Sequence, residues 1–244
     1  ESFGGIFLVG TPEQQRSGIR DTPELALHDW LSFGDFGRDA AAELWPRRWA
    51  EAYVNDSLGE VYRWLKARDI GFLPLPLWVE RGLHGEGNSV PRWHVTWGSG
   101  QRLATQLIGA LQAHARRNAL TLRFAHRVEA LLDEGGRIAG CRGALEDGSG
   151  EFEARADAGV LVAAGGINGS LERVRRHWHA DWGTPPATLL NGSHRYADGT
   201  LHDAASAVGA NVTHLDRMWN YAAGVHHWKP RKPVHGLSLV PPRS

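Results

Sequence analysis

The stretch ADAGVLVAAGGINGSLERVRRHW, residues 156–178, decides the fold. Its apolar run, residues 160–164, ends in Gly165 and Gly166, and a helical pattern follows from Ser170. Short apolar runs of this kind are typical of strands covered on both faces, so we predict a buried strand over residues 160–164. A glycine at the C-terminal end of such a strand lets the backbone approach a ligand. The alternative is a tight strand-to-helix turn without a ligand.

The residues before this stretch alternate with a period of two. Strand-like runs over residues 121–160 are divided by glycine-rich turns at residues 134–136 (EGG) and 147–150 (DGSG). Turns of this composition join antiparallel strands into hairpins. The pattern predicts a β-meander that leads into the strand over residues 160–164.

Helical patterns lie on both sides of the meander. Thr22 and Pro23 are typical of an N-cap and a first helical position. Other helices are expected over residues 46–68, 101–118, from 170, and over 200–208, the last ended by Gly209. Residues 71–98 are rich in Gly and Pro and show no period, so they predict a long functional loop. The fold class expected is α/β with α+β elements.

Composition excludes several classes of protein. The 244 residues carry 27 basic and 27 acidic side chains, which argues against a nucleic-acid partner. No apolar run is long enough for a membrane span, and no signal peptide is visible. The single cysteine, Cys141, excludes a disulfide framework and fits a cytoplasmic protein. The 11 tryptophans suit either an apolar pocket or a Trp-rich core.

Motifs for other chemistries are weak. Gly98 and Gly100 could open a G-x-G-x-x-G loop, but Leu103 occupies the third glycine position, and a simple turn before a helix fits better. The histidine pairs lack metal-ligand spacing, so no metal site is expected. No G-x-S-x-G elbow of a serine hydrolase is present.

The order of the elements identifies a family. A meander, a strand ending in AAGG, a helix and then YADGTLHDAASAVGA resemble the fumarate reductase and succinate dehydrogenase flavoprotein superfamily. Four long segments are similar to its 3-ketosteroid dehydrogenase-like branch: SFGGIFLVGTPEQQRSGIRD, HGEGNSVPRWHVTWGSG, WGTPPATLLNGSHRYADG and LDRMWNYAAGVHHW. Ala197 stands where the superfamily has a glycine before Asp198.

The resemblance implies a partial FAD-binding Rossmann-like domain with a β-meander and a helical layer over residues 1–190. The start of a cap or substrate domain is expected over residues 191–244. The chain begins at Glu1 with ESFGGIF, in mid-pattern, so we expect an internal fragment. The G-x-G-x-x-G unit that binds the FAD pyrophosphate, and any targeting signal, would precede it.

The resemblance also assigns a site. Contacts with FAD are expected from Ser2, Gly4, Gly5, Arg92, His94, Thr96, Gly98, Val128, Ala163, Ala164 and Gly165. Arg92 or His94 would stabilise negative charge on reduced flavin, or would simply hold the loop. Tyr221 and His226 are the candidate catalytic residues, because an imidazole can polarise a substrate carbonyl.

The function expected is that of an FAD-dependent dehydrogenase acting on CH–CH groups next to a carbonyl. An apolar, steroid-like small molecule is the expected substrate, and the fragment alone is expected to be inactive. One alternative is a fumarate-reductase-like enzyme that acts on a dicarboxylate. The other is a non-catalytic remnant or interaction module.

Overall fold

The computed structural model describes residues 4–37, 39–78, 87–220 and 224–238. Its contacts divide the described residues into two compact units, one up to residue 120 and the other from residue 121 to residue 238. This division does not fall at residue 190, where we expect the cap domain to begin. The expected boundary separates functional domains and stays a prediction.

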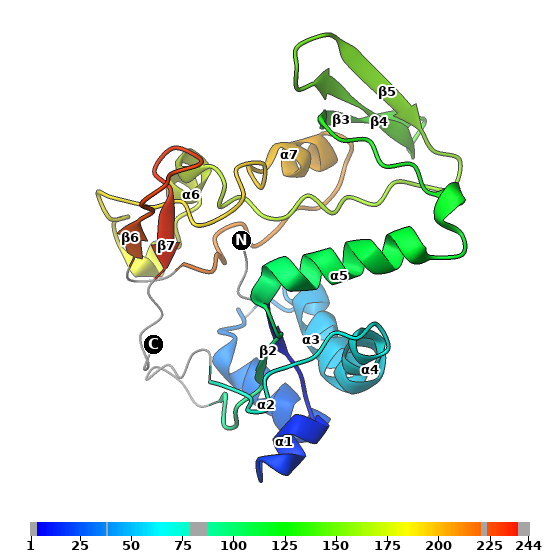
Figure 1. Ribbon diagram of the computed structural model, residues 1–244. Coiled ribbons are helices and arrows are strands. Elements are labelled where there is room, and N and C mark those ends of the chain that lie inside the picture. The colour runs from blue at the N-terminus through cyan, green and yellow to red at the C-terminus, as the bar shows by residue number, and fades with distance from the viewer. Residues whose placement is uncertain (1–3, 38, 79–86, 221–223, 239–244) are drawn as a thin grey trace. The chain divides into compact units, whose positions relative to one another are not determined.

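The first unit is mainly helical (Figure 1). Its helical elements are α1 (Pro12–Arg16), α2 (Pro23–Phe33), α3 (Leu44–Asp56), the π-helix Ser57–Tyr62, α4 (Arg63–Lys66), α5 (Ser99–Ala113) and the 3-10 turn Arg117–Ala119. The predicted start of α2 is confirmed, since the Thr22 side chain accepts a hydrogen bond from the Leu25 N–H at 3.2 Å. The helical segments expected over residues 46–68 and 101–118 are also present.

A two-stranded antiparallel ribbon crosses this unit. Strand β1 (Gly5–Phe7) pairs with β2 (Trp93–Val95), and Gly5 lies opposite Val95. Strand β2 corrects the prediction that residues 71–98 form only a loop. Three residues are too few to show a period, and the partner strand lies far away in the sequence. The ribbon runs beside an apolar cluster of Leu8, Tyr62, Leu65, Ile70 and Phe72.

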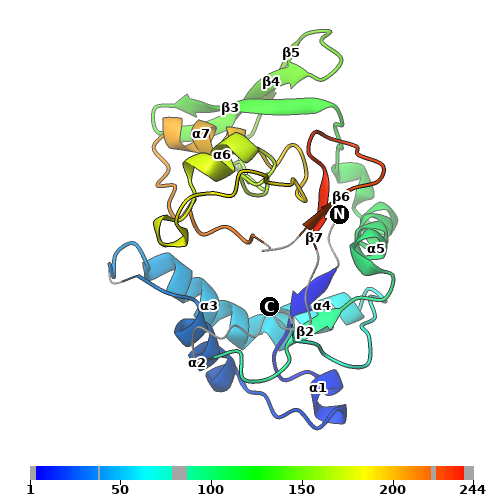
Figure 2. The same cartoon turned by 90° about the vertical axis from the view of Figure 1, so that its left-hand side faces the viewer.

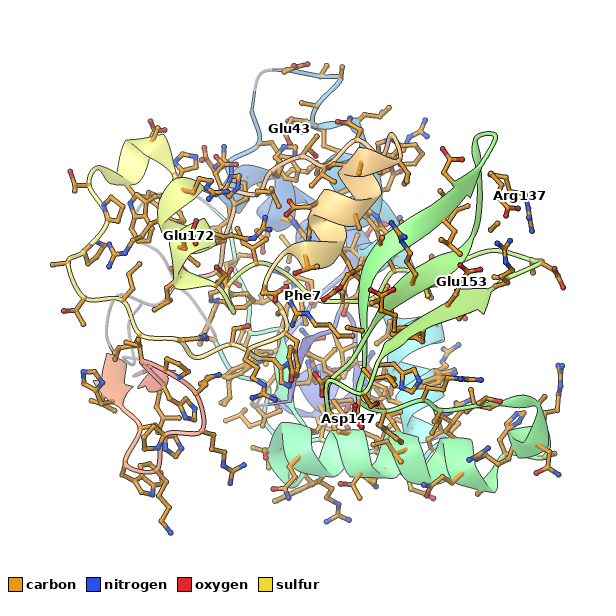
Figure 3. All side chains as sticks on the ribbon, turned by 90° about the horizontal axis from the view of Figure 1, so that it is seen from above. Phe7, Glu43, Arg137, Asp147, Glu153 and Glu172 are labelled. Carbon is orange, nitrogen blue, oxygen red and sulfur yellow. The ribbon has the colours of Figure 1, made fainter. Side chains whose placement is uncertain are left out.

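The predicted meander is confirmed in the second unit. Strands β3 (His126–Glu134), β4 (Arg137–Leu145) and β5 (Glu151–Arg155) form one antiparallel sheet in that order. Arg137 and Asp147 mark opposite ends of this sheet (Figure 3), where the two predicted turns lie. Gly135 and Gly136 have φ values of 67° and 89°, which explains why glycine closes the first turn.

Helices and a second ribbon complete this unit. The helix predicted from residue 170 is present as α6 (Leu171–Arg176), which Ser170 caps and the 3-10 turn Ala180–Trp182 follows. Helix α7 (Thr200–Ala207) packs against β3 (Figure 2), and Gly209 ends it with a positive φ of 91°. Strands β6 (Gly224–His226) and β7 (Gly236–Ser238) pair antiparallel.

The predicted strand over residues 160–164 is wrong. These residues form neither helix nor strand, and Gly165 therefore does not end a strand. Leu161 is 91% exposed and Val162 is 41% exposed. Residues 160–166 make no hydrogen bond to any other described residue. A buried parallel strand needs neighbours on both sides, and the described residues supply none.

No helix among the described residues is long and apolar enough to span a membrane.

Candidate functional site

Gly4 lies immediately before strand β1 in a crowded position. Its φ is +72°, and a Cβ atom there would lie 2.5 Å from the Thr96 hydroxyl oxygen and 2.7 Å from the Gly100 nitrogen. The carbonyl oxygen of Gly4 accepts a hydrogen bond from the Thr96 N–H at 3.1 Å. Gly5 is equally restricted, because a Cβ would overlap the Trp93 ring. Only glycine fits these positions, because Thr96, Gly100 and the Trp93 ring already fill the space that a Cβ atom would take.

Arg92 lies immediately before β2 and is buried, with 1% of its side chain exposed. Its Nε and Nη2 donate to the two carboxylate oxygens of Asp21 at 2.9 and 2.8 Å. Its Nη1 donates to Asp29 at 2.6 Å. Burial alone would raise the pKa of Asp29, but hydrogen bonds from Ser89 and Arg92 outweigh burial and lower it. Asp29 is therefore ionised near neutral pH.

His94 is completely buried in the middle of β2. Its Nδ1 is 2.8 Å from the Arg92 carbonyl oxygen, so Nδ1 carries the proton and donates. Its Nε2 then accepts from the Thr11 hydroxyl at 2.7 Å. Burial lowers the pKa of His94. The imidazole is therefore neutral at pH 7, and its contacts favour the second of our alternatives, in which it holds the loop.

Thr96 and Gly98 form the turn between β2 and α5. Thr96 is 2% exposed, and its hydroxyl donates to the Ser99 carbonyl at 3.3 Å. Gly98 has a φ of 76° and stands at the N-cap of α5 without a side-chain cap. The interpretation of this GSG segment as a turn before a helix is confirmed. Thus Gly4 lies against the turn that contains Thr96 and Gly98.

The second unit holds the other predicted FAD contacts. Val128 lies on the edge strand β3, opposite Gly143 and next to a bulge. Ala163 and Gly165 are exposed in the unpaired segment, and Ala164 is half-buried. A Cβ on Gly165 would lie 3.3 Å from the Ala197 Cβ. The segment that ends in AAGG is therefore adjacent to the YADG loop.

An ion pair between Arg127 and Asp198 stabilises this loop, and Arg127 was not among the site residues predicted from the sequence. Arg127 donates to Asp198 at 2.7 Å and to the Thr200 hydroxyl at 3.2 Å. Asp198 also accepts from the Thr200 N–H at 3.0 Å. Burial would raise the pKa of Asp198, but these bonds from Thr200 and Arg127 lower it overall. Asp198 belongs to a recognised motif, whereas nothing in the sequence marks Arg127.

A cavity of about 380 Å³ lies between β3 and α7. None of the predicted site residues lines it. Its walls are formed by Glu129, Ala130, Leu131, Thr200, Asp203, Ala204, Ala207 and Val208. Five of these are alanine, leucine or valine, so the wall is largely apolar.

The candidate catalytic residues are only partly described. Ser2 and Tyr221 lie outside the described residues. His226 ends the short strand β6, opposite Gly236, and is exposed. No group of three His, Cys, Asp or Glu side chains among the described residues could hold a metal ion.

Comparison with known proteins now decides the family. A family described as FAD binding domain matches residues 1–242. The chain belongs to this family. It is 43% identical, over 98% of its length, to a KsdD-like steroid dehydrogenase of Mycolicibacterium smegmatis, of which it covers 46%. A KsdD-like steroid dehydrogenase of Mycobacterium tuberculosis is also 43% identical, over 98% of this chain and 44% of that protein.

These matches confirm the resemblance to the 3-ketosteroid dehydrogenase-like branch, and FAD is the family's cofactor. The chain spans about half the length of the curated relatives it matches.

Two solved structures share the fold. A 3-ketosteroid-Δ4-(5α)-dehydrogenase from Rhodococcus jostii RHA1, solved with 4-androstene-3,17-dione, matches with a TM-score of 0.66 and 24% identity, over 88% of this chain and 47% of that one. The open form of a flavocytochrome c3 fumarate reductase matches with a TM-score of 0.59 and 19% identity, over 86% of this chain and 33% of that one. The expected flavoenzyme fold class is confirmed.

The described residues fit FAD in one respect. In the second unit, residues 160–166 present an exposed apolar segment whose backbone has no partner among the described residues. Exposed apolar surface beside unsatisfied backbone groups is what a nucleotide-binding wall needs.

Proposed function

We propose that this chain is part of an FAD-dependent dehydrogenase that removes or adds hydrogen across a carbon–carbon bond next to a carbonyl, in a steroid-like substrate. The 43% identity to KsdD-like steroid dehydrogenases over 98% of the chain carries the proposal. The exposed apolar segment over residues 160–166, whose backbone has no hydrogen-bond partner among the described residues, supports it independently.

Ser2, Gly4, Gly5, Thr96 and Gly98 would bring backbone against the flavin ring. The adenosine portion would lie along Val128, Ala163, Ala164 and Gly165. FAD, when bound, supplies the hydride acceptor or donor, and the protein supplies position and electrostatics.

The proton half of the reaction needs a side chain near the substrate carbonyl. A carbonyl acidifies the C–H bond next to it, so a base can remove that proton while hydride leaves the adjoining carbon. We propose His226 or Tyr221 for holding the carbonyl or moving this proton. The exposed position of His226 at the end of β6 keeps its ring accessible to a ligand.

The proposed substrate is a small apolar molecule that carries a carbonyl. We place the reaction in the cytoplasm, because a single cysteine suits a reducing compartment. The dicarboxylate alternative receives no support from the fumarate reductase match, since 19% identity establishes the fold alone.

The test is anaerobic flavin spectroscopy on the purified holoprotein. We expect the oxidised flavin absorbance to bleach when a 3-keto steroid is added, and succinate to leave it unchanged. Bleaching by succinate alone would select the dicarboxylate reductase. A protein without flavin absorbance, even after incubation with FAD, would select the non-catalytic alternative.

A further inference from the structure

We propose that Asp21, Asp29 and Arg92 form a positioning cluster that holds the ribbon β1–β2 against FAD, and that Arg92 does not act on the flavin itself. The inference rests on the proposed function, because that function places the ribbon beside the flavin. It resolves one alternative that the sequence leaves open, namely whether Arg92 stabilises reduced flavin or holds the loop.

The charge of Arg92 is already used inside the protein. Its guanidinium makes three hydrogen bonds, two to Asp21 and one to Asp29. The side chains of Arg92, Asp21 and Asp29 are 1%, 0% and 5% exposed. Both carboxyl groups lie within hydrogen-bond distance of the guanidinium, so its positive charge is engaged inside the protein. An anionic reduced flavin would have to compete with these nearer groups for that charge.

The cluster joins segments that are far apart in the sequence. Asp21 also accepts a hydrogen bond from the Gln14 side-chain amide at 2.9 Å. Asp29, on α2, accepts from the Ser89 N–H and hydroxyl, both at 2.7 Å. The segment after α1, helix α2 and the segment before β2 are therefore tied to one guanidinium.

The main chain carries this constraint to the proposed flavin contacts. The carbonyl of Arg92 accepts from the Leu8 N–H at 3.0 Å, which fixes the far end of β1. The strand register then places Gly5 opposite Val95, and the Thr96 N–H bonds to Gly4. Because a Cβ on Gly4 would lie only 2.5 Å from the Thr96 hydroxyl, Gly4 has little freedom relative to β2. A shift of Arg92 therefore moves Gly4 and Gly5 as well.

The test compares Asp29→Asn with Arg92→Gln in the FAD-loaded holoprotein. These variants change the charge of the cluster in opposite directions, but both loosen its geometry. We expect each variant to raise the Kd for FAD at least tenfold. The flavin midpoint potential should change little in either variant, or should shift in the same direction in both. Midpoint potentials that move in opposite directions would show that the guanidinium acts on the flavin electrostatically, and would overturn the proposal.

Arg92→Lys covers the case in which Arg92→Gln does not fold. Lysine keeps the charge but cannot make the two-point contact with Asp21. We expect it to weaken FAD binding at least tenfold. Wild-type FAD affinity in Arg92→Lys would mean that charge alone is sufficient, which contradicts a positioning role.

Arg155→Gln is the matched control. Arg155 also contacts two carboxylates, Glu134 and Glu153, but its side chain is 60% exposed. We expect this variant to bind FAD like the wild type. A loss equal to that of Arg92→Gln would attribute the effect to ion pairs in general and overturn the proposal.

A second measurement separates this inference from the proposed function. Amide hydrogen exchange at Leu8 and Thr96 reports on the ribbon without requiring FAD. We expect exchange at both amides to be at least tenfold faster in Asp29→Asn than in the wild type. If the wild type binds no FAD, the proposed function fails, and exchange still tests the cluster. Unchanged exchange in Asp29→Asn would overturn the cluster whatever the cofactor.

Discussion

Arg92 and Asp21 form a two-point ion pair with no solvent access, across 71 residues of sequence. Nε and Nη2 of Arg92 donate to the two Asp21 oxygens at 2.9 and 2.8 Å, and the side chains are 1% and 0% exposed. A buried pair of this kind is tolerated because its hydrogen bonds compensate the lost hydration. Removing Arg92 leaves the buried carboxyl groups of Asp21 and Asp29 without their cation.

Replacing Arg92 by methionine tests this dependence. We expect Arg92→Met to lower the free energy of unfolding of the first unit by about 3–5 kcal/mol, because Asp21 and Asp29 lose their cation. Chemical denaturation followed by tryptophan fluorescence measures the change. Arg155→Met is the control, and its midpoint should stay within error because solvent replaces an exposed ion pair. Equal losses in the two variants would contradict the argument.

Gly4 and Gly18 offer a comparison between crowding and backbone strain. Both have a φ of +72°, but a Cβ on Gly4 meets three atoms within 2.8 Å, whereas a Cβ on Gly18 meets none within 4 Å. Gly18→Ala should cost about 1–2 kcal/mol of stability through its left-handed backbone. Gly4→Ala should cost about 1–3 kcal/mol more through overpacking. Thermal denaturation of both variants measures the difference, and similar losses would mean that Thr96 moves aside freely.

Local signals in the sequence were sufficient for most helices and for the meander. Thr22 and Pro23 start α2 because capping involves only neighbouring residues. Gly135 and Gly136 close a hairpin because the turn needs positive φ values. The prediction of a strand over residues 160–164 was wrong because a strand in a sheet depends on residues far away in the sequence. Its apolar composition shows that it could be buried, but pairing depends on neighbouring strands that local composition does not reveal.

In the candidate site, too, contacts between residues far apart in the sequence could not be predicted. The motif resemblance selected Arg92 and His94, but not the side chains that bind them. Asp21 lies within the quoted segment ending in SGIRD, and Asp29 lies in the helix that follows. Nothing in a single sequence connects either carboxylate with an arginine 71 or 63 residues away. The resemblance could select Arg92 and His94 as site residues, whereas the partners of Arg92 could be identified only from the folded structure.

His94 should make the first unit sensitive to mild acid. Burial lowers its pKa from the ordinary value of 6.5, so the unfolded chain binds this proton more readily than the folded one. The stabilisation is therefore complete above about pH 6.5 and is lost as the pH falls toward the lowered pKa. Protonation at Nε2 would also end the hydrogen bond that His94 accepts from Thr11.

The measurement is the free energy of unfolding at pH 7 and pH 5 in the wild type and in His94→Gln. Glutamine does not titrate, so the wild type should lose more stability than the variant between these two values. Parallel losses in both proteins would assign the acid sensitivity to other groups, Asp29 among them.

Leu161 should control the aggregation of the chain. It is 91% exposed, and it lies in the apolar segment, residues 160–166, whose backbone has no hydrogen-bond partner among the described residues. An exposed apolar stretch with free N–H and C=O groups can pair with the same stretch of another chain. We expect Leu161→Lys to slow the rise in light scattering on incubation, because the added charge opposes that pairing.

Leu75→Lys is the control. Leu75 is 56% exposed but is flanked by Pro74 and Pro76, which cannot donate to a strand ladder. The control should aggregate at the wild-type rate. Equal slowing by both substitutions would show that charge alone improves solubility and that the unpaired segment has no special part in it.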